Sequence, residues 1–180
     1  ENTRAAIWDA MKRREVYGTS GSRPTLRFFG GWDFTGGDAK SRFLAETGYE
    51  KGVPMGGDLK AAPAGAKAPT FLVAALKDPI SGNLDRYQIV KGWLDDKGAT
   101  HEQVYDVAWG GDRKPGPDGK VPSVGSTVDV ENATWKNTIG APELIAVWKD
   151  PDFNSKQEAF YYGRVIEIPT PRWTAYDAKR

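Results

Sequence analysis

Three stretches in the middle of the chain decide its fold: TFLVAAL at 70–76, LDRYQIVKGWL at 84–94 and THEQVYDVAW at 100–109. The first is apolar on both alternating faces, which is typical of a strand in the middle of a sandwich. The other two alternate between apolar and polar residues, as strands with one covered face do. Turn-forming residues at 78–83 and 95–98 separate the three stretches. The pattern therefore predicts a mainly β fold built as an antiparallel β-sandwich.

Further strand-like segments lie on both sides of this centre, at intervals of roughly ten residues with glycine and proline turns between them. Gly30-Gly31 is expected to end the strand that begins at Thr25, and Trp32–Phe34 is expected to add a short piece beyond a bulge. Residues 110–125 are rich in Gly and Pro and predict a long loop. The other predicted strands are 16–17, 127–130, 132–139, 143–148 and 159–168.

The first residues of the chain predict a short amphipathic helix that ends in a glycine turn. Asn2 or Thr3 supplies an N-cap. Ile7, Ala10 and Met11 fall at i, i+3 and i+4, so they mark a buried face. A helix with one apolar face needs a surface that covers it. Because the chain opens almost directly into this helix, we expect it to be a fragment whose N-terminal part is missing.

Composition excludes several classes of protein. The chain has 25 basic and 24 acidic side chains, so no general electrostatic attraction to nucleic acid is expected. It has no cysteine, which excludes disulfide scaffolds, thiolate zinc sites and cysteine nucleophiles. No apolar run reaches the roughly 18 residues that a membrane span needs.

The sequence predicts no metal site within the chain. His101 is the single histidine, and a metal-dependent hydrolase gathers several imidazoles and carboxylates. Asp150-Pro151-Asp152-Phe153-Asn154 has the alternating oxygen donors with which calcium loops begin. It lacks the glycine and the later glutamate of such loops, so we interpret it as a turn.

Seven tryptophans raise the alternative of carbohydrate binding, because an aromatic face can cover a sugar ring. Those in the strongest predicted strands, at 93, 109 and 148, are expected in the core. Trp32, Trp135 and Trp173 lie in turns or irregular stretches and are the better candidates for sugar contacts.

Several segments in order closely resemble the C-terminal part of the domain-of-unknown-function family 3604. They are ENTRAAIWDAMKRREVYGTSGSRPTLRFFGGWDF, GVPMGGDL, HEQVYDVAW, VPSVGSTVD, NTIGAPEL, VWKDPDF and FYYGRVIEIPTPRW, and together they cover nearly the whole chain. That family is bacterial and often carries a secretion signal. It resembles metal-dependent hydrolases of the polymerase-and-histidinol-phosphatase (PHP) superfamily, in which a His-x-His metal motif lies near the start of a distorted β/α barrel.

The resemblance implies three parts: residues 1–23 as the last helix and strand of an absent catalytic domain, 24–168 as an accessory β-sandwich, and 169–180 as an extended tail. It implies that the chain is not catalytic alone and that a divalent metal binds in the missing N-terminal domain. It also implies a periplasmic or exported protein. Four residues are expected to reach the absent active site through hydroxyl or guanidinium contacts with an anionic substrate group, namely Tyr17, Thr19, Ser20 and Arg23.

Two other readings stay open beside this one. The first is the carbohydrate-binding sandwich that uses exposed tryptophans. The second is a purely structural domain that packs against a barrel or forms a homo-oligomer. An exposed apolar patch around Ile7 and Met11 would fit the second reading.

Overall fold

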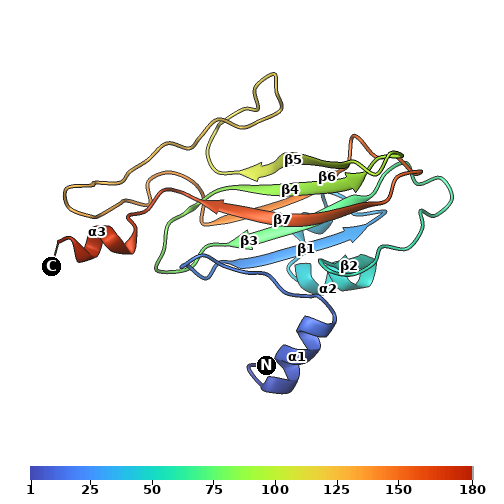
Figure 1. Cartoon of the computed structure of the whole chain (residues 1–180), viewed down its shortest axis with the longest axis horizontal. Coiled ribbons are helices and arrows are strands. Elements are labelled where there is room, and N and C mark those ends of the chain that lie inside the picture. Colours follow the sequence, from blue (N-terminus) through green and yellow to red (C-terminus); the bar gives the residue numbers. More distant parts are fainter. Residues whose placement is uncertain (180) are drawn as a thin grey trace.

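A computed structural model describes residues 1–179 of the 180-residue chain as two antiparallel sheets with a few short helices (Figure 1). The first sheet has the strand order β2 (Gly52–Pro54), β1 (Thr25–Gly31), β3 (Thr70–Leu76) and β6 (Glu143–Lys149). The second has the order β5 (Thr100–Trp109), β4 (Leu84–Leu94) and β7 (Ala159–Glu167). The predicted mainly β, antiparallel fold is confirmed.

The inner faces of the two sheets share one core. Phe28, Phe71 and Val73 from the first sheet pack with Tyr87 and Ile89 from the second. Each of these side chains is buried, as expected where two sheets pack face to face. The central stretches of the sequence, β3 and β4, therefore form the middle of the sandwich.

The glycines at the end of β1 continue the strand, so the predicted break at Gly30-Gly31 is wrong. Both residues pair with β3 on one side and with β2 on the other. A side chain at Gly31 would meet the ring of Phe34, which turns back into the core beyond the strand. The backbone N–H of Phe34 donates to Thr70 Oγ1 at 3.0 Å, so Trp32–Phe34 is not a second strand piece.

Three other short predicted strands are also wrong. Val16 and Tyr17 run beside the sandwich without pairing to any strand. Residues 127–130 and 132–139 form a tight turn with a single bridge between Asp129 and Thr134. The Asp129 carboxylate accepts from the backbone N–H of Asn132, and such side-chain contacts compete with a regular ladder.

Helices flank the sheets, and they are α1 (Arg4–Lys12), the 3-10 turn η1 (Asp38–Lys40), α2 (Leu44–Lys51) and α3 (Trp173–Asp177). Thr3 caps α1 by accepting from the N–H of Ala6, as the sequence predicts. The tail is not extended throughout, because α3 occupies part of it. Within residues 1–179, none of the helices has the length and apolar character that crossing a membrane requires.

The long loop at 110–125 is fastened to the outer face of the second sheet by buried charges. Arg113 contacts the Asp85 carboxylate at 2.6 Å and donates to the carbonyl oxygen of Pro122. Arg86 pairs with Asp106 at 3.1 Å and also donates to Pro122. These contacts explain why this loop, rich in turn-forming residues, has a defined path.

The packing of α2 on β1 gives a test of the fold. A Cβ at Gly48 of α2 would overlap the ring of Phe29, whereas a Cβ at Gly36 would meet nothing. Gly to Ala inside a helix normally stabilises by about 1 kcal/mol. Here we expect Gly48→Ala to lower the free energy of unfolding by about 1–3 kcal/mol, because overpacking outweighs helix propensity.

Urea unfolding followed by circular dichroism measures this change, with Gly36→Ala as the matched control. The control is expected to leave the free energy of unfolding within about 0.5 kcal/mol of the parent value. A stabilising Gly48→Ala would show that α2 does not lie on Phe29 as described.

Candidate functional site

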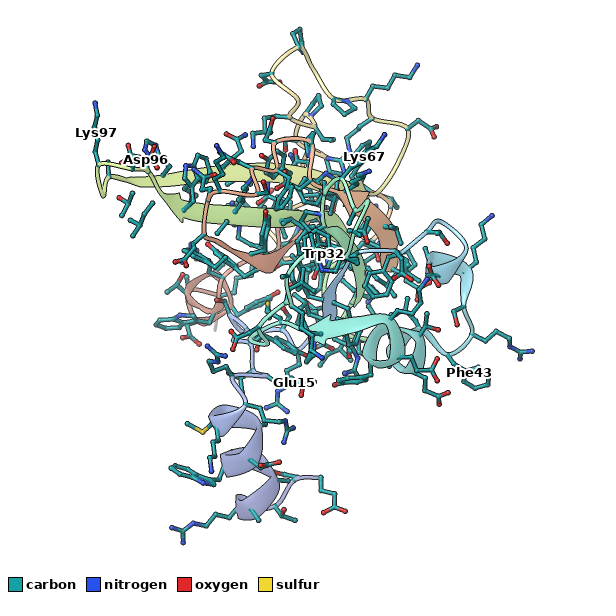
Figure 2. The ribbon with its side chains drawn as sticks, turned by 90° about the vertical axis from the view of Figure 1, so that its right-hand side faces the viewer. Glu15, Trp32, Phe43, Lys67, Asp96 and Lys97 are labelled. Atoms are coloured by element: carbon teal, nitrogen blue, oxygen red, sulfur yellow. The ribbon has the colours of Figure 1, made fainter. Side chains whose placement is uncertain are left out.

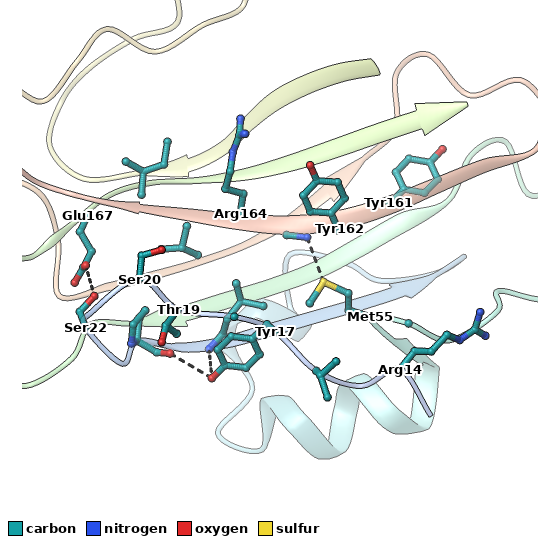
Figure 3. A pocket seen from close by; sticks show the side chains of 18 of the residues that line it. Arg14, Tyr17, Thr19, Ser20, Ser22, Met55, Tyr161, Tyr162, Arg164 and Glu167 are labelled. Carbon is teal, nitrogen blue, oxygen red and sulfur yellow. Dashed lines mark hydrogen bonds between the residues drawn. The ribbon is translucent and has the colours of Figure 1, made fainter. Parts of the chain in front are cut away.

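A groove of about 840 Å³ runs along the open edge of the sandwich, between residues 14–24 and strand β7 (Figure 3). Val16 and Tyr17 form part of one wall, and the backbone of β7 forms the other. Met55 and Gly56, which follow β2, also line the groove, and Glu167 lies at one end.

Three of the four residues predicted to contact an anionic substrate line this groove: Tyr17, Thr19 and Ser20. The hydroxyl of Tyr17 already donates to the carbonyl oxygen of Pro24 at 3.2 Å. Arg23 is exposed and lies outside the groove lining, and its backbone N–H donates to the Asp78 carboxylate at 2.8 Å. The structure therefore brings the hydroxyl side chains together and leaves the guanidinium apart.

Glu167 adds a carboxylate to the groove, and the sequence analysis did not predict it. One of its carboxylate oxygens accepts from the Ser22 hydroxyl. The other, Oε1, is buried and has no hydrogen-bond partner among the described residues. A carboxylate with an open acceptor favours a donor group, such as an amine or an N–H, over an anion beside Thr19 and Ser20.

Specific contacts build the junction between α1 and the sandwich, which lies near Glu15 in Figure 2. Arg14 has φ 62° and its guanidinium contacts the Asp58 carboxylate at 3.0 Å. Gly56, with φ 93°, has no room for a Cβ because the backbone of Arg14 lies against it. The Tyr49 hydroxyl donates to Glu15, and this hydrogen bond, together with burial, raises the pKa of Tyr49.

Helix α1 leaves its apolar side chains uncovered by the described residues 1–179. None of its residues is buried, and Ile7, Trp8 and Met11 are 50%, 66% and 58% exposed. The prediction that Ile7, Ala10 and Met11 form a buried face is therefore wrong for this chain. The apolar stripe exists, but α1 points away from the sandwich (Figures 1 and 2).

The calcium-like turn at 150–154 contacts a buried lysine. The Nζ of Lys91 lies 2.7 Å from Asp150 Oδ2 and donates to the carbonyl oxygen of Asp152, also at 2.7 Å. Tyr161 donates to Asp150 and Tyr105 donates to Asp152. Because an ammonium group already pairs with these oxygens, the turn is a structural ion-pair cluster.

No group of three or more His, Cys, Asp or Glu side chains within residues 1–179 could hold a metal ion. His101 lies on β5, an edge strand, where its ring stacks on Trp93 and its Nε2 lies 3.0 Å from the Asp95 carboxylate. The hydrogen bond to His101 and those to backbone N–H groups lower the pKa of Asp95.

The three tryptophans considered for sugar binding lie on separate segments. Trp32 is half-buried, packs edge-on against Phe153 and donates its ring N–H to the carbonyl oxygen of Lys60. Trp135 is half-buried in the loop before β6. Trp173 is exposed in α3, which Figure 1 shows far from the end of β1 where Trp32 follows.

Comparison with known proteins gives one result. The family model described as "Protein of unknown function (DUF3604)" matches residues 1–180. The chain belongs to the DUF3604 family. No curated protein and no solved structure matches it. The DUF3604 match thus confirms the family that the ordered segments indicate.

Tyrosine titration tests the buried hydrogen-bond network of the DUF3604 chain. Burial raises the pKa of Tyr87, and burial together with a carboxylate partner raises the pKa of Tyr105 and Tyr161. The stability that these hydroxyls contribute is fully present below the unfolded pKa of about 10 and is lost as pH rises above it.

Absorbance at 295 nm measures tyrosinate formation. Between pH 9.5 and 11, with the protein still folded by circular dichroism, we expect fewer than the seven tyrosines to ionise. The urea-unfolded chain should titrate all of them near pH 10. Ionisation of every tyrosine near pH 10 in the folded protein would contradict the network.

Proposed function

We propose that this chain is the C-terminal accessory sandwich of a bacterial, exported, PHP-like metal-dependent hydrolase. Residues 1–23 would complete a preceding catalytic domain, which would hold the divalent metal. The sandwich would not catalyse a reaction alone. The hydrolase class rests on the family resemblance, and the position of α1 is the observation that supports a preceding domain.

Helix α1 supports the proposal because its apolar stripe has no cover in this chain. Burying a large apolar side chain contributes about 1.5–3 kcal/mol relative to leaving it exposed. Because Ile7, Trp8 and Met11 are exposed in this chain, they do not make this contribution to stability. Isolated helices shorter than about 12 residues are marginal in water, so this nine-residue helix is expected to need a packing surface.

The junction at Arg14 adds a second argument. A helix that merely trailed from the domain would need no defined exit angle. Here the left-handed Arg14, the close approach to Gly56 and the Glu15–Tyr49 hydrogen bond fix that angle. A fixed orientation is what a helix shared by two packed domains requires.

A second candidate, self-association of the sandwich through α1, is favoured by the same exposed patch. In a symmetric dimer, Ile7, Trp8 and Met11 would meet the same residues of the partner. The two candidates differ in what covers the patch. Substituting charged residues into the apolar stripe of α1 distinguishes between them.

The double variant Ile7→Asp, Met11→Asp provides this test. In the 180-residue chain we expect its melting temperature to stay within about 1–2 °C of the parent value, because both side chains are exposed. In a longer protein that contains the preceding domain, we expect a fall of at least about 5 °C. Lys12→Glu, on the same helix but outside the stripe, is the control.

Calorimetry measures the melting temperature, and sedimentation velocity measures the oligomeric state. Loss of a dimer in the 180-residue double variant would support self-association instead. A longer protein that tolerates both aspartates would contradict the domain contact.

Metal content tests the hydrolase assignment separately. The longer protein is expected to bind a divalent metal, and the 180-residue chain is expected to bind none at stoichiometric level. Inductively coupled plasma mass spectrometry after dialysis against Zn²⁺ or Mn²⁺ measures both. Stoichiometric metal on the 180-residue chain would overturn the assignment.

A further inference from the structure

Strand β7 is an edge strand whose outer side faces the groove. Among the described residues 1–179 it pairs with β4 alone, in antiparallel register from Ala159 to Glu167. Backbone groups of successive residues in such a strand turn alternately toward the neighbour and away from it. The N–H of Gly163 points away from β4, since it donates to Met55 Sδ at 3.4 Å. Tyr161 and Val165, two residues to either side, share its orientation.

The outer ladder of β7 is therefore open over five residues. Within residues 1–179, the backbone N–H and C=O groups of Tyr161 and Val165 on this side have no hydrogen-bond partner. Gly163 donates only to the thioether sulfur of Met55, which is a weak acceptor. Open edges of this kind are templates for pairing with another strand.

Side chains at this edge favour an apolar partner. Phe160, Tyr162 and Ile166 share the solvent face of β7 and are 63%, 36% and 36% exposed. Charged side chains that would protect the edge are few, and Arg164 is the one on that face. On the opposite wall Val16 and Tyr17 are also exposed.

The second wall limits the size of the occupant. Residues 14–24 run along the groove and are fixed at both ends, by Arg14–Asp58 and by Ser22–Glu167. A single extended chain needs only the spacing of about 4.8 Å that separates paired strands. A second folded sandwich would need room for its whole sheet as well as for the strand at its edge. The geometry thus selects a slender, extended chain over another copy of this protein.

The open acceptor at Glu167 adds a charge requirement. Glu167 lines the groove, and its Oε1 is buried without a hydrogen-bond partner among the described residues, so it favours a basic side chain, which supplies the strongest hydrogen bond. Backbone donors and acceptors that recur at every second residue match the repeat of a peptide strand. An oligosaccharide has no such repeat of N–H groups.

We propose that the groove binds an extended polypeptide segment, which adds to the sheet as a strand antiparallel to β7. The segment alternates in apolar character and carries a Lys or Arg residue opposite Glu167. This is β-augmentation, in which backbone pairing gives affinity and side-chain pockets give specificity. The proposal stands independently of what precedes α1.

A designed probe tests it: the acetylated and amidated heptapeptide Arg-Val-Thr-Val-Thr-Val-Thr, labelled with fluorescein, whose valines share the solvent face with Tyr162 and Ile166. In the proposed register its first residue lies opposite Glu167, its third opposite Val165 and its seventh opposite Tyr161. Fluorescence anisotropy with the 180-residue chain is expected to give saturable binding. Amide shifts in ¹⁵N spectra should be largest at Tyr161, Gly163 and Val165.

N-methylation of the peptide backbone supplies the matched control. Methylation at the third residue blocks an N–H that faces β7, and we expect affinity to fall at least tenfold. Methylation at the second residue blocks an N–H that faces away and should change affinity less than threefold. Equal effects, or shifts that avoid β7, would overturn the proposal.

The variant Glu167→Gln tests whether the groove requires a basic residue in the peptide. Exchanging the first residue of the peptide for Glu should weaken binding at least tenfold to the parent chain. In Glu167→Gln, which keeps a hydrogen bond to Ser22, this preference should shrink to about threefold or less. Glu102→Gln, on the far edge strand β5, should retain it. An unchanged preference in Glu167→Gln would contradict the pairing.

Two further outcomes would also overturn the proposal. No saturation by 2 mM peptide would show that the edge does not accept a strand. A dimer of the free chain that the peptide dissociates would assign the groove to a second copy.

Discussion

The two sheets are tied together by Tyr87, and much of the remaining structure depends on this one side chain. Its ring is fully buried, and its hydroxyl crosses from β4 to donate to the carbonyl oxygen of Arg27 in β1 at 2.9 Å. Burying such a ring contributes about 1.5–3 kcal/mol, and a buried hydroxyl without a partner would cost about 1–3 kcal/mol. The hydroxyl takes the space of a side chain at position 163, so β7 carries glycine there. The fixed contact between the sheets thereby also shapes the edge that lines the groove.

The junction at Arg14 and the groove share one set of supports. Met55 and Gly56 follow β2; Gly56 lies against the backbone of Arg14, and Met55 contacts β7 at the N–H of Gly163. Residues 14–24 then run past this edge to Ser22, which donates to Glu167. The path of the chain out of α1 therefore creates the wall of the groove. The helix and the groove lie on one connected surface of the molecule.

The sequence predicted the central fold well, because the apolar run of β3 and the alternation over β4 and β5 depend only on which faces are buried. It failed where local chemistry and tertiary contacts compete. Gly30-Gly31 has the composition of a break, but Phe34 needs that space and the strand continues. The side chains of Lys91 and Glu167 lie on the inner side of their strands, on the same face as the apolar residues two positions away. A charged residue at an inward position of the alternating pattern was the signal by which the sequence could have indicated both residues. Their partners, Asp150 and Ser22, are far away in sequence and could not be inferred.

Of the predicted site, Tyr17, Thr19 and Ser20 do gather at one groove, whereas Arg23, Trp135 and Trp173 lie elsewhere.

The central claim is that α1 belongs to an interface with a preceding domain, and hydrogen–deuterium exchange measures this directly. Exchange of the amides from Ala6 to Lys12 is compared between the 180-residue chain and a longer protein that includes the residues before Glu1. We expect fast exchange in the 180-residue chain and strong protection in the longer protein, with β3 and β4 equally protected in both. Equally fast exchange of these helix amides in the longer protein would contradict it.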